Sequence, residues 1–373
     1  MAQPKQKKLI SIVAGARPNF MKIAPIIRAF EEAREYFDYR LIHTGQHYDE
    51  MMNAVFFQEF GIPEPHIVFE GKRGEGDAEQ TARILVQFDA ECKQLRPDLV
   101  MVVGDVNSTL ACSIVAKKQG ILLAHIESGL RSGDRLMPEE INRIITDSIS
   151  DLFFVTEPSG VQSLLKEGQP EKSIFYVGHV MVDNLYYQLS KLNSENLSLP
   201  ISGELKRCFN RYVVVTLHRP SNVESAQSLQ NVVNILEDIA KEIPIIFPIH
   251  PRTRKNLEKF GIELSNNIHA IDPLPYMEFL NLWKDAAFVL TDSGGLQEET
   301  TALSVPCLTM RTNTERPITI DEGTNILVGC DFVKIHHEVR KILGGAIPTG
   351  RKPKFWDGFA AQRIVKTLIE LMH

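Results

Sequence analysis

The sequence predicts an α/β protein with two Rossmann-like domains, each built on a doubly wound parallel sheet. Apolar strand patterns alternate with helical patterns along the 373 residues, which is typical of βαβ units. The strands are continuous apolar runs, as expected for strands buried on both faces. A polar, irregular stretch between residues 182 and 211 separates two such series, and a chain of this length usually forms more than one domain.

The first series starts with the run LISIVAG at residues 9–15, followed by a helical pattern that opens near Pro18. Further strands are predicted at 39–45, 97–105, 121–128, 151–157 and 173–178. Helical patterns occupy residues 18–33, 51–61, 78–95 and 108–120. Residues 1–185 therefore form the predicted N-terminal domain.

The second series starts with the run RYVVVTLHR at residues 211–219 and continues with a helical pattern at 231–243. Further strands are predicted at 244–250, 267–274, 286–295, 305–311 and 325–329. Residues 186–356 form the predicted C-terminal domain. The last segment, 357–373, is amphipathic, and we expect it to be a helix that packs back at the domain junction.

Charge and composition favour a small substrate. The formal net charge is −6 without long blocks of like charge, so neither a nucleic-acid nor a membrane partner is indicated. No apolar run reaches about 18 residues, and the start MAQPKQKK lacks the apolar segment of a signal peptide. The five cysteines are scattered, without CxxC spacing, which predicts a reducing cytoplasm and no zinc site.

Polar side chains stand where the buried strands end. These residues are Arg17, Asp105, Glu127, His218, His250 and Ser293. Ligands of open parallel sheets bind at the carboxyl ends of the strands. We therefore expect the residues of the first half to face those of the second half across a cleft that closes around a ligand and excludes water.

The segment TDSGGLQEE is suited to an anion such as a diphosphate. Gly294 and Gly295 let backbone amides approach the anion at a helix N-terminus, and Glu299 could accept ribose hydroxyls. Arg17 and Lys22, around the start of the first helix, suit a phosphate as well. The alternatives are an ordinary βα turn for the glycines and a solvated surface charge for Lys22.

Paired carboxylates at strand ends predict acid–base chemistry. Asp105 and Glu127 follow apolar strands, and two such carboxylates near each other raise the pKa of one of them. Glu139 is a candidate third member, although surface ion pairs also explain its charged surroundings. His218 precedes Arg219, a pair suited to a departing phosphate, while a structural role remains the alternative for His218 and His250. No HExxH-type spacing occurs, so we expect no metal site.

Nine segments of the chain carry a resemblance to a known family: GARPNFMKIAP, TGQHYD, GDVNSTLA, HIESGLRSGDRLMPEEINR, TLHRPSNV, PIHPRT, TDSGGLQEE, TERP and EGTN. They closely resemble segments of the non-hydrolysing UDP-N-acetylglucosamine 2-epimerases of bacteria and archaea. The segments occur in the same order and cover nearly the whole chain. The resemblance implies a GT-B fold with a cleft between the two domains and a cytoplasmic, homodimeric isomerase of polysaccharide biosynthesis without cofactor. It also implies elimination of UDP to a 2-acetamidoglucal, followed by re-addition that inverts C2.

The resemblance also assigns residues. Those implied to be catalytic are Asp105, Glu127, Glu139 and His218. Those implied to bind the UDP group of the substrate are Arg17, Lys22, Phe279, Ser293, Gly294, Gly295, Glu299 and Arg316. Many members bind a second UDP-GlcNAc as activator, and the matching positions are Gln46, His47, Gln80, Arg219 and His250.

Alternative functions follow from departures within these motifs. Ser128 stands where the family commonly has Ala, and HPRT also occurs in 2-epimerases of UDP-2,3-diacetamido uronic acids, whereas TERP resembles the UDP-GlcNAc branch. A hydrolysing 2-epimerase would release ManNAc and UDP, but such relatives lack the TGQH pattern. A GT-B glycosyltransferase would need an acceptor, and a UDP-sugar sensor would have no use for three carboxylates.

Overall fold

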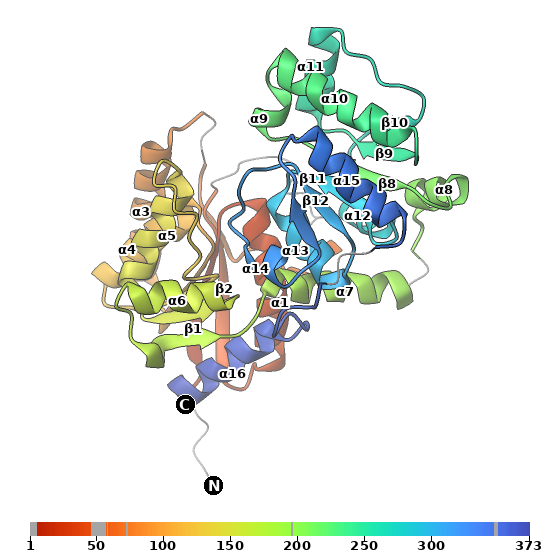
Figure 1. Cartoon of the computed structure of the whole chain (residues 1–373). Coiled ribbons are helices and arrows are strands. Elements are labelled where there is room, and N and C mark those ends of the chain that lie inside the picture. The colour runs from red at the N-terminus through yellow and green to blue at the C-terminus, as the bar shows by residue number, and fades with distance from the viewer. Residues whose placement is uncertain (1–5, 46–56, 58, 72–73, 195–196, 347–349) are drawn as a thin grey trace. The chain divides into compact units, whose positions relative to one another are not determined.

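The computed structural model describes residues 6–45, 57, 59–71, 74–194, 197–346 and 350–373, apart from the side chain of Arg17. The chain divides into two compact units (Figure 1). Unit 1 consists of Met1–Tyr187 and Lys354–His373, and unit 2 consists of Gln188–Pro353. Each unit contains one sheet, and all strand pairs in both sheets are parallel.

The sheet of unit 1 has seven strands in the order β3-β2-β1-β4-β5-β6-β7. The strands are β1 Lys8–Ala14, β2 Phe37–His43, β3 Ile67–Val68, β4 Leu99–Val103, β5 Leu122–Ile126, β6 Leu152–Val155 and β7 Ile174–Tyr176. The helices are α1 Arg17–Glu32, α3 Asp77–Gln94, α4 Asn107–Lys118, α5 Pro138–Ile149, α6 Pro158–Lys166, the 3₁₀ helix η1 Glu171–Ser173, α7 Val180–Ser194, which runs on into unit 2, and α16 Ala360–Met372.

The sheet of unit 2 has six strands in the order β10-β9-β8-β11-β12-β13. The strands are β8 Val213–Thr216, β9 Ile245–Pro248, β10 Ile268–Ile271, β11 Phe288–Thr291, β12 Cys307–Thr309 and β13 Asn325–Leu327. The helices are α8 Pro200–Cys208, α9 Pro220–Val223, α10 Ala226–Ala240, α11 Pro251–Phe260, α12 Tyr276–Trp283, α13 Gly294–Leu303, α14 Ile318–Asp321 and α15 Phe332–Leu343.

Both strand orders are those of a doubly wound Rossmann sheet, so the predicted fold class is confirmed. The central strands are buried on both faces; β4, for example, is buried at every residue. Helices α3, α4 and α5 pack side by side in unit 1, and α1 packs beside α16 (Figure 1). This layering explains why the strands lack alternation, since helices cover the sheet and leave only the strand ends for polar residues.

Two expectations about secondary structure need comment. The stretch between residues 182 and 211, expected to be an irregular linker, contains most of α7 and all of α8, so that prediction was wrong. Its polar residues are used in packing: the carboxylate of Glu278 on α12 accepts hydrogen bonds from the backbone N–H and hydroxyl of Ser202. The helix predicted at 51–61 lies largely outside the described residues.

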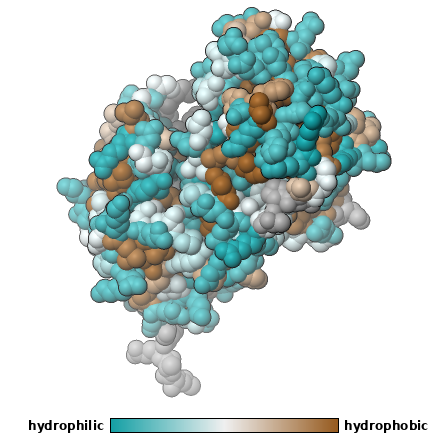
Figure 2. All heavy atoms as spheres, viewed as in Figure 1, coloured by the Kyte–Doolittle hydropathy of each residue, from teal (hydrophilic) through white to brown (hydrophobic). Residues whose placement is uncertain are grey.

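The surface shown in Figure 2 mixes hydrophilic residues with smaller hydrophobic patches. Within the described part of the chain, no helix has both the length and the apolar character needed to cross a bilayer. Among the same residues, His, Cys, Asp and Glu side chains form no group of three with the geometry of a metal site.

Candidate active site

Each sheet has one point at which its strand order reverses, between β1 and β4 in unit 1 and between β8 and β11 in unit 2. Ligands of such sheets bind outside the carboxyl ends of the strands at this point. In unit 1, Asn19 ties the two strand ends together: its Oδ1 accepts the Ala16 N–H at 3.0 Å, and its Nδ2 donates to the Val103 carbonyl at 3.1 Å. The turn into α1 is thereby held beside the residue that precedes Gly104 and Asp105.

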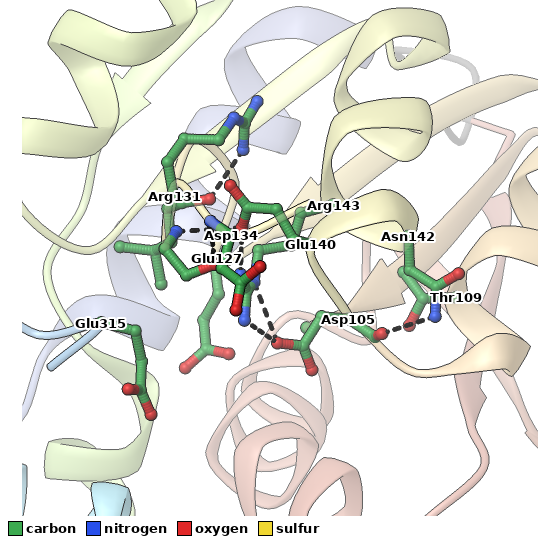
Figure 3. Close-up of polar contacts among 12 residues, drawn as sticks. Asp105, Thr109, Glu127, Arg131, Asp134, Glu140, Asn142, Arg143 and Glu315 are labelled. Carbon is green, nitrogen blue, oxygen red and sulfur yellow. Dashed lines mark hydrogen bonds and ion pairs between the residues drawn. The ribbon is translucent and has the colours of Figure 1, made fainter. Parts of the chain in front are cut away.

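Asp105 lies just beyond β4 with its carboxylate partly exposed. The Nε atom of Arg143 on α5 donates a hydrogen bond to Asp105 Oδ2 at 3.0 Å, and Arg143 Nη2 lies 2.8 Å from the same oxygen (Figure 3). Asn142 donates to the Asp105 backbone carbonyl at 2.8 Å. The carboxylate is therefore oriented by a guanidinium while 28% of the side chain stays accessible.

Glu127 follows β5, which pairs with β4, so both carboxylates stand at the ends of neighbouring strands. The Glu127 side chain is only 2% exposed and forms an ion pair with Lys22, while His179 Nε2 lies 3.9 Å from its Oε1. The backbone of Glu127 has φ +64°, an uncommon conformation for a residue with a side chain. Strained backbone of this kind gathers at functional sites, where the surrounding structure holds it in place.

Gly104 leaves room for this ion pair. A Cβ atom at Gly104 would lie 3.3 Å from Lys22 Nζ and 3.5 Å from Glu127 Oε2, and the residue has φ +69°. The structure therefore brings Lys22, Glu127 and the end of β4 together. Lys22, predicted to bind phosphate, has its ammonium group directed at a carboxylate.

Glu139 and Glu140 open α5 but differ in burial. Glu139 is exposed, whereas Glu140 is 1% exposed and accepts backbone N–H groups from Ser132 at 2.9 Å and Gly133 at 3.1 Å. Glu140 also pairs with Arg143, which thus joins it to Asp105 (Figure 3). Glu139 remains a candidate catalytic residue without a described link to the other two carboxylates.

A chain of amides joins a predicted activator residue to the end of β4. Asn107 donates to Gln80 Oε1 at 2.9 Å, and Asn142 donates to Asn107 Oδ1 at 3.3 Å and to the Asp105 carbonyl. Two other predicted activator residues, Gln46 and His47, lie outside the described residues, as does the side chain of Arg17.

In unit 2, His218 is oriented by the fully buried Asp292. The Nδ1 atom of His218 lies 3.0 Å from Asp292 Oδ1, and the backbone N–H groups of His218 and Arg219 donate to the same carboxylate. Burial alone would raise the pKa of Asp292, but these bonds and one from Asn222 outweigh it and the pKa is lowered. Since the ionised carboxylate accepts from Nδ1–H, Nε2 of the 43% exposed His218 side chain is the nitrogen available to a ligand.

His218 also lines a pocket of about 170 Å³. The pocket is bounded by Thr216, His218, Pro248, His250, Pro273, Leu274 and Phe279. The rings of His218 and His250 lie 6.1 Å apart. Partial burial and the neighbouring His218 and Arg252 lower the pKa of His250. Residues predicted for catalysis, for UDP and for the activator therefore share one apolar pocket with two imidazoles at its edge.

The N-terminus of α13 lies at the carboxyl end of β11. Ser293 is its N-cap residue, and a Cβ atom at Gly295 would meet nothing within 4 Å, so this backbone is open to close approach. At Gly294 the same atom would lie 2.9 Å from Glu315 Oε1. Burial opposes ionisation of Glu315, but hydrogen bonding from Arg311 and the charge of Arg316 hold its pKa at about 2.

The remaining predicted UDP ligands are held by other side chains. The Tyr276 hydroxyl of α12 donates to Glu299 Oε1 at 2.7 Å. Arg316 forms an ion pair with the buried Glu298. These contacts fix Glu299 and Arg316 within the same unit as the pocket and the α13 N-terminus.

Comparison with known proteins identifies the family. The family model for UDP-N-acetylglucosamine 2-epimerase matches residues 29–369. The chain belongs to the UDP-N-acetylglucosamine 2-epimerase family. It is 41% identical to the UDP-N-acetylglucosamine 2-epimerase of Methanocaldococcus jannaschii, covering 96% of this chain and 98% of that protein. It is also 35% identical to the UDP-2,3-diacetamido-2,3-dideoxy-D-glucuronate 2-epimerase of Pseudomonas aeruginosa, covering 98% and 100%.

Solved structures agree with this assignment. The crystal structure of the M. jannaschii epimerase in complex with UDP-GlcNAc and UDP matches with a TM-score of 0.83 at 39% identity, covering 97% of this chain and 99% of that chain. The epimerase of Neisseria meningitidis bound to UDP-GlcNAc matches with a TM-score of 0.84 at 27% identity, covering 97% and 100%. The resemblance seen in the sequence and the GT-B fold it implied are confirmed, and epimerases are isomerases.

Two residues that contact predicted site residues were not predicted from the sequence. His179 stands three residues after β7, and its surroundings include Glu127. Asp292 precedes Ser293, and its Oδ1 atom lies 3.0 Å from His218 Nδ1. The strand-end rule applies to both positions, because β7 and β11 end just before them.

Proposed function

We propose that this protein interconverts UDP-GlcNAc and UDP-ManNAc by inverting C2 of the sugar. The observation that carries the proposal is the pair of carboxylates, Asp105 and Glu127, at neighbouring strand ends beside the point where the strand order of unit 1 reverses. The family membership and the relatives that are UDP-GlcNAc 2-epimerases support it.

The C2 proton of the sugar is not acidic, because no ketone stands next to C2. The reaction therefore starts with elimination and not with simple deprotonation. A carboxylate removes the proton while UDP leaves from C1, which gives a 2-acetamidoglucal and UDP. Re-addition delivers a proton to the opposite face of C2 and rejoins UDP at C1. The route involves no net oxidation, so it needs no cofactor.

Asp105, Glu127 and Glu139 are the proposed acids and bases at C2. Lys22 pairs with Glu127 and orients its carboxylate, as Arg143 orients that of Asp105. His218, held by Asp292, donates from Nε2 to the diphosphate as it departs.

UDP binds mainly to unit 2 in this proposal. The pocket beside Phe279 takes the uridine, and Glu299 takes the ribose hydroxyls. The diphosphate rests on the backbone of the α13 N-terminus, where amides and the helix dipole favour negative charge. The proposed ligands in unit 2 are Ser293, Gly294, Gly295 and Arg316. Arg17 and Lys22 are the proposed phosphate ligands of unit 1.

We also propose a homodimer and a second UDP-GlcNAc that acts as activator. The proposed activator ligands are Gln46, His47, Gln80, Arg219 and His250. The amide chain from Gln80 through Asn107 and Asn142 to Asp105 offers a path by which occupancy could affect a catalytic residue. The proposed location is the cytoplasm.

The test is incubation with UDP-GlcNAc alone in D2O, followed by proton NMR. Reversible formation of UDP-ManNAc with deuterium at C2 is expected, and it should be lost in Asp105→Asn and Glu127→Gln, which should still bind UDP. Free ManNAc with stoichiometric UDP would replace the proposal by a hydrolysing epimerase. Consumption only in the presence of a sugar acceptor would replace it by a glycosyltransferase.

The second candidate substrate is a UDP-2,3-diacetamido uronic acid. It is favoured by the HPRT segment at His250–Thr253 and by the P. aeruginosa relative. Measurement of kcat/KM for both sugars decides the matter: we expect UDP-GlcNAc to be preferred, and a higher value for the uronic acid would assign the chain to the other substrate.

A further inference from the structure

We propose that the buried pair His125–Asp147 positions both catalytic strand ends, and that it acts through the backbone rather than through contact with the sugar. This inference rests on the proposed function, because it takes Asp105 and Glu127 as the reacting carboxylates. The two side chains are each 0% exposed, so neither can touch a substrate directly. They are positioning residues, not catalytic ones.

The hydrogen bonds of His125 run in two directions. Its Nδ1 atom lies 2.6 Å from Asp147 Oδ1, and its Nε2 atom lies 2.8 Å from the carbonyl oxygen of Gly104. A carbonyl oxygen can only accept a hydrogen bond, so Nε2 carries a proton. His125 therefore fixes the peptide that leads into Asp105.

Asp147 extends the same support to the segment after Glu127. Its Oδ2 atom accepts the backbone N–H of Gly129 at 3.0 Å, and Arg131 Nη1 lies 2.7 Å from it. The pair thus holds Gly104, one residue before Asp105, and Gly129, two residues after Glu127.

Both held segments have unusual backbone conformations. The φ angles are +69° at Gly104, +64° at Glu127 and +80° at Gly129. At Gly129 a Cβ atom would lie 2.3 Å from the Gly160 carbonyl oxygen, so the loop passes too closely for any side chain. Such conformations persist only where neighbouring groups hold them, and His125–Asp147 supplies a bond to each segment.

Asp147 is buried beside two basic side chains, His125 and Arg131. Burial alone would raise the pKa of Asp147, but His125 and Arg131 outweigh that effect and the pKa is lowered. Arg131 pairs in turn with Glu167 at 2.6 Å. Burying ions contributes little net stability compared with apolar packing, whereas it fixes geometry through directional bonds. Apolar side chains at these two positions would stabilise the core better than His125 and Asp147 do. A positioning role explains why the polar pair is present.

Two substitutions separate the two bonds of His125. Asparagine places its amide nitrogen near the position of Nδ1, so H125N keeps the contact with Asp147 and loses that with Gly104. Glutamine reaches the position of Nε2, so H125Q keeps the Gly104 bond, while Asp147 retains Gly129 and Arg131. We expect H125N to lower kcat roughly 100-fold through displacement of Asp105, and H125Q to recover at least about tenfold of that loss.

Binding and stability are measured on the same variants. UDP affinity should stay within about twofold of wild type, because the substituted residue acts on kcat and not on the UDP ligands. Glu91→Gln is the matched control: it breaks a buried ion pair with Arg40 in the same unit and should lower the melting temperature without changing kcat. If H125N does not fold, Asp147→Asn takes its place, with the same expected loss of kcat at unchanged UDP affinity.

Equal kcat in H125N and wild type, or equal loss in H125N and H125Q, would overturn the positioning role. A loss of kcat in Glu91→Gln as large as that in H125N would overturn it too, since destabilisation alone would then explain the effect. Asp105→Asn is assayed in parallel. If wild type does not epimerise UDP-GlcNAc, the proposed function fails. If wild type is active and Asp105→Asn turns over at the same rate, the proposed role of Asp105 fails, and the inference fails with it. If Asp105→Asn is inactive beside an active wild type, the His125 variants judge the inference alone.

Discussion

Glu139 and Glu140 are adjacent and chemically identical, yet the fold gives them different tasks. Glu140 is buried and accepts two backbone N–H groups and an arginine, whereas Glu139 faces solvent. Burial alone would raise the pKa of Glu140, but the N–H groups of Ser132 and Gly133 outweigh it and the pKa is lowered. Of the two, only Glu139 is free of structural bonds in the described part of the chain, and its side chain is exposed to solvent.

Glu139→Gln and Glu140→Gln form a matched pair at this scale. We expect Glu140→Gln to lower the free energy of unfolding by roughly 3 kcal/mol, because Arg143 and two N–H groups lose a charged acceptor. Glu139→Gln should change that free energy by less than about 0.5 kcal/mol and should lower the rate of C2 deuterium incorporation by about 100-fold or more. Urea denaturation and NMR measure the two quantities. A stable, fully active Glu139→Gln would remove Glu139 from the catalytic group.

The residues that could be predicted from the sequence are those whose role follows from strand position. Asp105, Glu127 and His218 stand at the ends of apolar runs, and the structure places all three at carboxyl ends of parallel strands. Their partners could not be predicted in the same way. Lys22 reaches Glu127 across 105 residues of sequence, and Asp292 reaches His218 across 74. Such pairs depend on the packing of distant elements, which the local pattern does not encode.

At the scale of elements, the same distinction separates strands from helices. The fully buried strands were evident from their apolar composition. Helices α7 and α8 were not predicted, because the stretch that contains them is polar. Their stability comes from tertiary contacts, such as the hydrogen bond from Ser202 to Glu278. Helix α16 was expected as a helix, and the structure assigns it to unit 1, where it packs against α1. Its N-terminus is capped by Asp183 of α7, which accepts the N–H groups of Ala360 and Ala361 at 3.1 and 2.7 Å.

The capping of α16 predicts a pH dependence. Burial raises the pKa of Asp183 from 3.8 to about 6, against the effect of the two N–H groups. The folded state therefore keeps a proton that the unfolded state releases, so the contribution of Asp183 to stability is greatest below pH 4 and falls as pH rises to about 6. Asp183→Asn does not titrate. Relative to that variant, wild type should lose ~1.4 kcal/mol of unfolding free energy between pH 5 and pH 8.

Urea denaturation of wild type and Asp183→Asn at both pH values measures this difference directly. Other carboxylates titrate equally in the two proteins and cancel. A difference in unfolding free energy between the two proteins that is the same at pH 5 and pH 8 would contradict the raised pKa. A wild type that gains stability relative to Asp183→Asn between pH 5 and pH 8 would show that the pKa is lowered instead.

At the scale of the whole molecule, unit 1 is built from both ends of the chain and unit 2 from its middle. Lys354–His373 brings Trp356 into unit 1, where its side chain is fully buried and its Nε1 donates to the Thr156 carbonyl at 3.3 Å. Unit 1 therefore cannot complete its core until the last residues of the chain have been made. Unit 2 has no such requirement, since its strands and helices are continuous in sequence.

The two tryptophans of the chain report on the two units separately, because Trp356 is buried in unit 1 and Trp283 is buried in unit 2. In Trp356→Phe the fluorescence comes from Trp283 alone, and in Trp283→Phe from Trp356 alone. If UDP binds mainly to unit 2, a concentration 100 times its Kd should stabilise the unit that Trp283 reports by about 2.7 kcal/mol. The Trp356 signal should shift less. Thermal unfolding followed by fluorescence, with and without UDP, measures the midpoint in each variant. Equal shifts of the midpoint in the two variants would show that the units unfold together. A shift confined to the Trp356 signal would place UDP on unit 1.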